Sequence, residues 1–83
     1  MDKILISLEI PSIERSYEVY VPDFLPVREV TRLLVQAVQE LSGGLYAPSG
    51  SEFLVSETKD FLLSEEASLS EYDIGNGDRL LLM

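Results

Sequence analysis

A change in hydrophobic periodicity partway along the chain constrains the fold more than any other feature. Apolar side chains recur at every second position through residues 3–10, the period of a strand with one buried face. The alternation resumes over residues 17–21, so the two runs are predicted to pair as an antiparallel hairpin with its loop near residues 11–15. Pro22 cannot donate to a strand ladder and should end the second strand. The side chains expected to face the core are Ile4, Ile6, Leu8, Ile10, Tyr17, Val19 and Val21.

Residues 27–41 repeat instead with a period of ~3.6, which is typical of a helix that buries one face. Pro26 suits the first turn of this helix, where its missing N–H is not needed. Gly43 and Gly44 supply a stop signal. The apolar stripe predicted to pack on a sheet consists of Val27, Val30, Leu34, Ala37, Val38 and Leu41.

Short apolar segments follow the helix. Residues 53–55 and 61–63 are expected to form strands, and residues 69–74 a turn or 3₁₀ segment. The last strand, residues 79–83, follows a strong turn signal at residues 75–78. It can enter the middle of the sheet, parallel to the first strand. This order predicts a β-grasp, an α+β fold in which a mixed sheet of four to five strands packs on one α-helix, with residues 1–83 forming one domain.

Two segments resemble known proteins. Residues 17–27, Tyr-Glu-Val-Tyr-Val-Pro-Asp-Phe-Leu-Pro-Val, together with Tyr72-Asp73-Ile74 and Gly77-Asp78, resemble the YukD family. Its members are small ubiquitin-like proteins of bacterial type VII (WXG100, or ESX-type) secretion systems. Residues 68–74, with the leucines that follow, resemble the corresponding part of ubiquitin. The resemblance implies a ubiquitin-like fold and a role as a cytoplasmic accessory component of such a system.

The C-terminal sequence differs from that of conjugated ubiquitin-like modifiers and sulfur carriers, which end in a Gly-Gly tail. Here residues 79–83 contain no glycine, as in the YukD family. We therefore expect a non-conjugating protein-binding module. Two alternatives stay open: a ubiquitin-like cytosolic domain excised from a larger membrane protein of the same system, or a modifier or sulfur carrier lacking its tail.

Residues suited to catalysis are scarce. The chain has no cysteine and no histidine, so thiolate chemistry, the commonest general base and the commonest metal ligand are missing. The paired carboxylates Glu65-Glu66 and Glu71 with Asp73 do not match a calcium-binding loop and are interpreted as solvated turns. We expect no enzymatic activity, no catalytic residue, no metal and no cofactor.

The net charge of −9 limits the classes of partner. Nucleic acid and anionic membrane surfaces would repel the chain, and no apolar run approaches the ~18 residues of a membrane span. A protein partner with a basic surface fits better, although the charge can equally serve only solubility. We expect a cytoplasmic location and, from the resemblance, a partner in a cytoplasmic region of the secretion membrane complex or its ATPase. The oligomeric state is not indicated.

Strand alternation also predicts a binding face on the solvent side of the sheet. If the even-numbered residues of the first strand face the helix, Leu5 faces outward, and the same reasoning directs Phe53 and Val55 inward. The predicted protein-binding patch consists of Leu5, Tyr20, Leu54, Leu81 and Met83. The competing interpretation is a scatter of ordinary exposed apolar residues, or a face used only for weak self-association. The helix face around Arg28, Arg32 and Gln36 is the second candidate surface.

Overall fold

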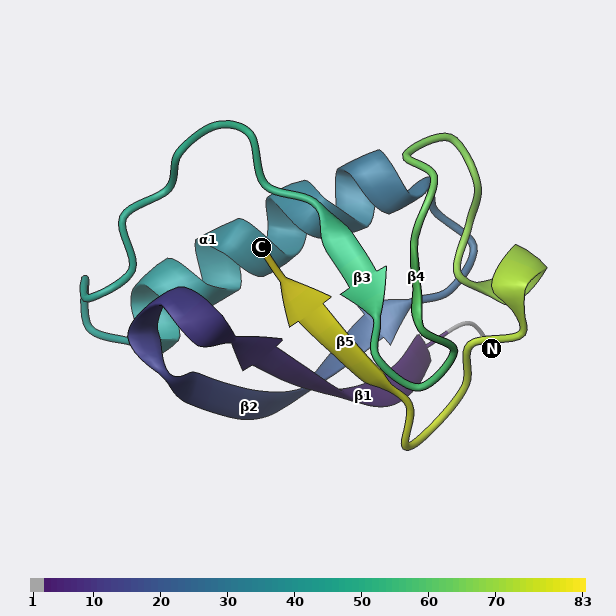
Figure 1. The fold of residues 1–83 in the computed structure, drawn as a ribbon, viewed down its shortest axis with the longest axis horizontal. Coiled ribbons are helices and arrows are strands. Elements are labelled where there is room, and N and C mark those ends of the chain that lie inside the picture. Colours follow the sequence, from purple (N-terminus) through teal and green to yellow (C-terminus); the bar gives the residue numbers. More distant parts are fainter. Residues whose placement is uncertain (1–2) are drawn as a thin grey trace.

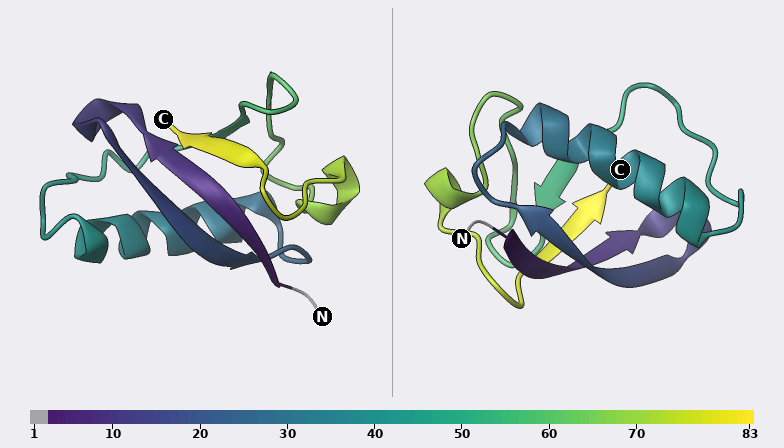
Figure 2. Two further views of the ribbon diagram at one scale, coloured as in Figure 1. Left: turned by 90° about the horizontal axis from the view of Figure 1, so that it is seen from below. Right: turned by 180° about the vertical axis from the view of Figure 1, so that it is seen from behind.

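The computed structural model describes residues 3–83 and shows a five-stranded mixed sheet with one α-helix on one side (Figures 1 and 2). The chain begins with a hairpin of β1 (Lys3–Ile10) and β2 (Arg15–Pro22), followed by α1 (Val27–Leu41). Three short strands complete the sheet: β3 (Leu54–Ser56), β4 (Phe61–Leu62) and β5 (Arg79–Leu82). Met1 and Asp2 lie outside the described residues.

The strand order is β2-β1-β5-β3-β4, so the first and last strands of the chain form the centre of the sheet. β5 runs parallel to β1, and Leu8 pairs with Leu80. On its other side β5 runs antiparallel to β3. The predicted β-grasp, including the entry of the last strand beside the first, is confirmed.

The hairpin follows the predicted alternation. A 3₁₀ turn (Pro11–Ile13) connects the strands, and Glu14 takes the left-handed conformation, with φ 55°, that lets the chain reverse. The inward residues of β1, from Ile4 to Ile10, are all buried, and Val21 of β2 is buried with them. Tyr17 and Val19 are half-buried because β2 lies at the edge of the sheet.

α1 starts immediately after Pro26, which is the N-cap residue of the helix. The prediction that Pro26 lies within the first turn is therefore off by one position. A distant segment satisfies the first free backbone donors of the helix: the Val27 N–H donates to the Ala67 carbonyl at 2.7 Å and the Arg28 N–H to the Glu65 carbonyl at 3.0 Å. At the other end, Gly43 adopts φ 65° and its N–H donates to the carbonyl of Glu40 at 3.1 Å. The predicted glycine stop is therefore confirmed.

The buried stripe of α1 differs from the prediction at three positions, the first of which is Ala37, which is only half-buried. Leu41, the last residue of the helix, is 53% exposed. Thr31 is buried, although it was not predicted to be. Its hydroxyl donates to the Val27 carbonyl at 2.8 Å, so the buried polar atom has a hydrogen-bond partner within the same helix. Leu80 and Leu82, as predicted, belong to the same buried core as Val30 and Leu34.

Candidate protein-binding surface

The side of the sheet opposite α1 carries the odd-numbered residues of β1 and β5. Leu5 and Leu81 are half-buried, and Met83 is 48% exposed. Tyr20 on β2 is 69% exposed and pairs directly with Leu5. The prediction that these four residues lie away from the core is therefore confirmed.

The fifth predicted residue, Leu54, does not face outward, so the prediction is wrong at this position. Leu54 is completely buried and pairs with Leu82, while Ser56 pairs with Leu80. Residues directly opposite each other in a sheet point to the same face, so Leu54 and Ser56 face α1 and Val55 faces outward. Phe53 is likewise 42% exposed and not buried. The sequence could not fix this register, because Phe53, Leu54 and Val55 are all apolar and show no alternation.

Correcting the register brings together five outward apolar side chains, which we call the outer patch. Val55 pairs with Leu81 on one side and with Leu62 on the other. Phe53 and Met83 exchange two backbone hydrogen bonds, of 3.4 and 3.0 Å. The outer patch therefore spans β5, β3 and β4 without interruption and consists of Phe53, Val55, Leu62, Leu81 and Met83.

Leu5 and Tyr20 do not join the outer patch. Leu81 pairs with Glu9, and Leu5 lies four residues earlier on β1, a separation of about 13 Å along the strand. Ser7 lies between them on the same face and pairs with Arg79 of β5. The predicted continuous surface is thus divided by polar side chains into the outer patch and a separate Leu5–Tyr20 pair.

Acidic side chains border the outer patch. A groove beside Phe53 and Leu62 is also lined by three carboxylates, from Glu52, Glu65 and Glu66. On the β1 side, Glu9 is the direct neighbour of Leu81. An apolar surface with a negative border matches a partner that offers apolar side chains flanked by Lys or Arg.

Glu52 also organises the loop between α1 and β3. Its carboxylate accepts hydrogen bonds from the Tyr46 hydroxyl at 2.8 Å, the Ser49 N–H at 2.7 Å and the Gly50 N–H at 3.2 Å. Burial alone would raise the pKa of Glu52, but these hydrogen bonds outweigh burial and lower it. Burial, followed by the hydrogen bond to Glu52, raises the pKa of Tyr46 to about 12. Gly50, Ser51 and Glu52 of this loop line the groove beside Phe53 and Leu62.

The second predicted surface, on the helix, is also a groove. Arg28, Arg32 and Gln36 line it together with Glu52 and Glu65, which lie outside the helix. Arg32 is partly neutralised, because its guanidinium donates to Glu29 at 2.6 Å on the same helix. This groove is therefore mixed in charge and less apolar than the outer patch.

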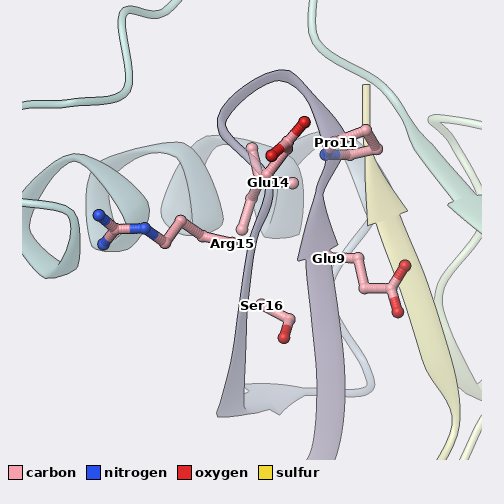
Figure 3. Close-up of a pocket in the computed structure, with 6 residues that line it drawn as sticks. Glu9, Pro11, Glu14, Arg15 and Ser16 are labelled. Atoms are coloured by element: carbon pink, nitrogen blue, oxygen red, sulfur yellow. The ribbon is translucent and has the colours of Figure 1, made fainter.

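A third hollow lies at the hairpin end of the sheet (Figure 3). Its lining includes Glu9, Glu14 and Arg15, but the side chains of Glu9 and Arg15 point to opposite sides of the hairpin. Acid–base chemistry requires groups that converge on one reacting atom. Among residues 3–83, no three acidic side chains gather where they could hold a metal ion. The same residues include no helix with the length and apolarity of a membrane span.

The family model described as WXG100 protein secretion system (Wss), protein YukD, matches residues 5–82. The search of curated proteins gave no match. Among solved structures, the ubiquitin-like domain of the Mycobacterium tuberculosis type VII secretion system protein EccD1 superposes with a TM-score of 0.78 and 15% identity, covering 100% of this chain and 99% of that one. The EccD5 ubiquitin-like domain from Mycobacterium xenopi gives 0.81 and 17%, covering 100% and 94%.

A chain of the MycP5-free ESX-5 inner membrane complex is also structurally similar, with a TM-score of 0.79 and 20% identity. It matches 100% of the present chain, which spans only 21% of the length of that protein. At these identities the structural likeness shows the ubiquitin-like fold alone.

Proposed function

Because the chain belongs to the YukD family of the WXG100 protein secretion system, we propose that it is a non-conjugating protein-binding module of such a system. It acts in the cytoplasm, as an accessory component that docks on a cytoplasmic region of the secretion membrane complex or on its ATPase. It performs no catalysis. The observation that carries this proposal is the outer patch, an uninterrupted apolar surface on an otherwise strongly acidic chain.

The geometry of the outer patch favours a docking surface over a scatter of unconnected exposed apolar residues. Leu62 is 61% exposed, and its strand partner Val55 connects it to Leu81. A partner covering these side chains removes apolar area from water, at about 25 cal/mol per Å² before the costs of association. The bordering carboxylates of Glu9, Glu52 and Glu65 would select a partner surface rich in Lys or Arg.

A related proposal is that this chain corresponds to a domain of a longer membrane protein of the same machine. The observation in its favour is the likeness to one part of a chain in an ESX-5 inner membrane complex. The full reading frame and the transcript distinguish the two cases. Both assign the same binding role to the outer patch.

The test is the double variant Leu62→Asp with Met83→Asp. Both side chains are about half exposed, so the carboxylates remain solvated in the free domain and its stability should change by less than ~1 kcal/mol. In a complex they would be desolvated without a partner, which costs several kcal/mol. Leu45→Asp is the matched control, because Leu45 is 53% exposed but lies in the loop after α1, outside the outer patch.

The readouts are binding of the purified ATPase and cytoplasmic regions of the membrane complex, and secretion of a WXG100 substrate. We expect the double variant to fold, to lose binding and to impair secretion, while Leu45→Asp behaves as wild type. A double variant that folds and still binds and supports secretion would remove the outer patch as the docking surface. The helix groove around Arg28 and Arg32 would then be the surface to change.

A further inference from the structure

The β2 edge of the sheet is long and unpaired, unlike the opposite edge. β2 contains eight residues and has only β1 as a neighbour, whereas β4 at the other edge contains two residues. Figure 1 shows β2 running along the border of the sheet. An edge of this length presents a row of backbone donors and acceptors that can pair with another strand.

The hydrogen-bond pattern of β1 shows which backbone groups of β2 are free. The Leu5 carbonyl accepts from the Gly77 N–H at 2.9 Å, and the Ser7 N–H donates to the Asp78 carbonyl at 3.0 Å. The odd-numbered residues of β1 therefore direct their backbone groups toward the β5 side. Backbone groups alternate in direction along a strand, so the even-numbered residues of β1 bond to β2.

The partners of those even-numbered residues on β2 are its odd-numbered residues, such as Val19, which pairs with Ile6. The N–H and C=O groups of Ser16, Glu18 and Tyr20 consequently point out of the sheet. Apart from strand pairing, no hydrogen bond among residues 3–83 involves the backbone of these three residues. Three consecutive outward positions are thus available to a second strand.

We propose that a second copy of this chain pairs with this edge, antiparallel, through β2. β2 of one copy pairs with β2 of the other, in the register that places the twofold axis at Val19. Glu18 then lies opposite Tyr20 of the second copy, and both positions have outward backbone groups that can bond. Beyond the ends of the pairing, Arg15 faces Asp23 of the second copy, which lies in the bend one residue past β2, so two pairs of opposite charge approach each other across the axis.

The neighbouring registers are poorer. Centring the axis on Glu18 places two carboxylates directly opposite each other, which is destabilising. Centring it on Tyr20 places Glu18 opposite Pro22 of the second copy, so the missing proline N–H falls on the rung next to the axis. With the axis at Val19, Pro22 faces Ser16 at the ends of the pairing, and the Glu18–Tyr20 rungs next to the axis keep both donors. With Val19 at the centre, the half-buried Val19 side chains of the two copies meet on the inner face, and Tyr17 lies opposite Val21.

Pairing through β2 leaves the outer patch free, because β5, β3 and β4 lie on the other side of β1. This proposal can therefore be tested independently of the proposed docking function.

The role of the β2 backbone in pairing can be tested with Glu18→Pro. The Glu18 N–H faces solvent, so proline there removes an outward donor without breaking the pairing with β1. Glu18→Ala is the matched control, because it removes the carboxylate and keeps the N–H.

The measurement is sedimentation equilibrium over a wide range of concentrations at about 0.15 M salt, where the repulsion between two acidic copies is largely screened. We expect a reversible wild-type dimer. Glu18→Pro should weaken it by about tenfold to a hundredfold, because the twofold axis doubles the loss of one backbone hydrogen bond. Glu18→Ala should still dimerise. Arg15→Asp and Asp23→Arg should each weaken the dimer, and the two together should restore it.

Three outcomes would overturn the proposal: a wild-type chain that stays monomeric at every concentration, a dimer that Glu18→Pro leaves intact, or a dimer disrupted by Leu62→Asp in its place. If Glu18→Pro fails to fold, amide hydrogen exchange of the wild-type chain decides the matter. The amides of Glu18 and Tyr20 should be protected at high concentration and exchange freely at low concentration. Equal exchange at both concentrations would refute pairing at this edge.

Discussion

The hydroxyl of Tyr46 donates a 2.8 Å hydrogen bond to the carboxylate of Glu52 and thereby closes the loop between α1 and β3. Tyr46 is buried, and the Ser49 and Gly50 N–H groups donate to the same carboxylate. One acidic side chain therefore orders a loop that has no regular secondary structure between Leu45 and Phe53. The pairing also makes stability depend on pH at both extremes.

The pH prediction follows from these two shifts. The pKa of Glu52 is lowered in the folded state, so its contribution is present above the usual glutamate pKa and is lost as pH falls through the lower, folded-state value. The pKa of Tyr46 is raised from 10.0 to about 12, so the stability it provides is complete below pH ~10 and is lost as pH rises toward 12. Urea unfolding across pH should show both losses.

Tyr46→Phe tests the alkaline loss directly. At neutral pH the variant should be less stable by about 1–2 kcal/mol, because a hydrogen bond to a charged acceptor is removed. The difference from wild type should then shrink between pH ~10 and ~12. A difference that stays constant over this range would show that Tyr46 does not titrate as described.

Leu80→Ala tests the central packing of β5. Leu80 is completely buried, so the substitution should cost ~2–5 kcal/mol through lost transfer energy and a residual cavity. Leu45→Ala, at an exposed position, should change stability by less than ~0.5 kcal/mol. A denaturation midpoint for Leu80→Ala equal to that of wild type would contradict the position of β5 in the core.

The register of β3 is tested by placing the same charge on either side of the sheet. Leu54→Asp buries a carboxylate at a fully buried site, a cost of several kcal/mol that approaches the total stability of a small domain. Leu62→Asp, at a side chain 61% exposed, should leave the fold intact. Circular dichroism and urea unfolding distinguish them; a folded Leu54→Asp together with an unfolded Leu62→Asp would reverse the assignment.

The turn before β5 predicts different outcomes for two nearby glycines. Gly77 has φ +88°, so Gly77→Ala should cost roughly 1–2 kcal/mol by forcing an L-residue into the left-handed region. Gly75 does not have such a φ and has no atom within 4 Å of an added Cβ. Gly75→Ala should therefore be neutral, or stabilising by up to ~1 kcal/mol. Equal losses for both variants in thermal unfolding would show that strain is not the cause.

The charge distribution predicts that the chain does not bind nucleic acid. The net charge is −9, and Arg32 is already paired with Glu29. The chain should therefore pass through a DNA column at about 0.15 M salt, close to physiological ionic strength. Retention that weakens as salt increases would contradict this expectation.

The hairpin, the helix and the central position of β5 could be predicted from the sequence, because each depends on local periodicity or on the order of elements. The binding surface could be predicted only in part. Which side chains become neighbours there depends on how distant strands align, and the pairing of Glu9 with Leu81 separates Leu5 from Leu81. No local sequence pattern determines how far β5 is shifted along β1. Phe53, Val55 and Leu62 are missing from the predicted patch for the same reason, since their runs lack alternation.

The parallel pairing of β1 with β5 has a consequence for synthesis of the chain. Ser7 and Arg79 are direct neighbours, so the centre of the sheet joins segments separated by most of the sequence. The β1–β2 hairpin can form early, but it has no central partner until residues 79–82 have been translated. Until then the nascent chain exposes an apolar strand edge on β1. Products of interrupted translation should therefore depend on chaperones and be degraded quickly.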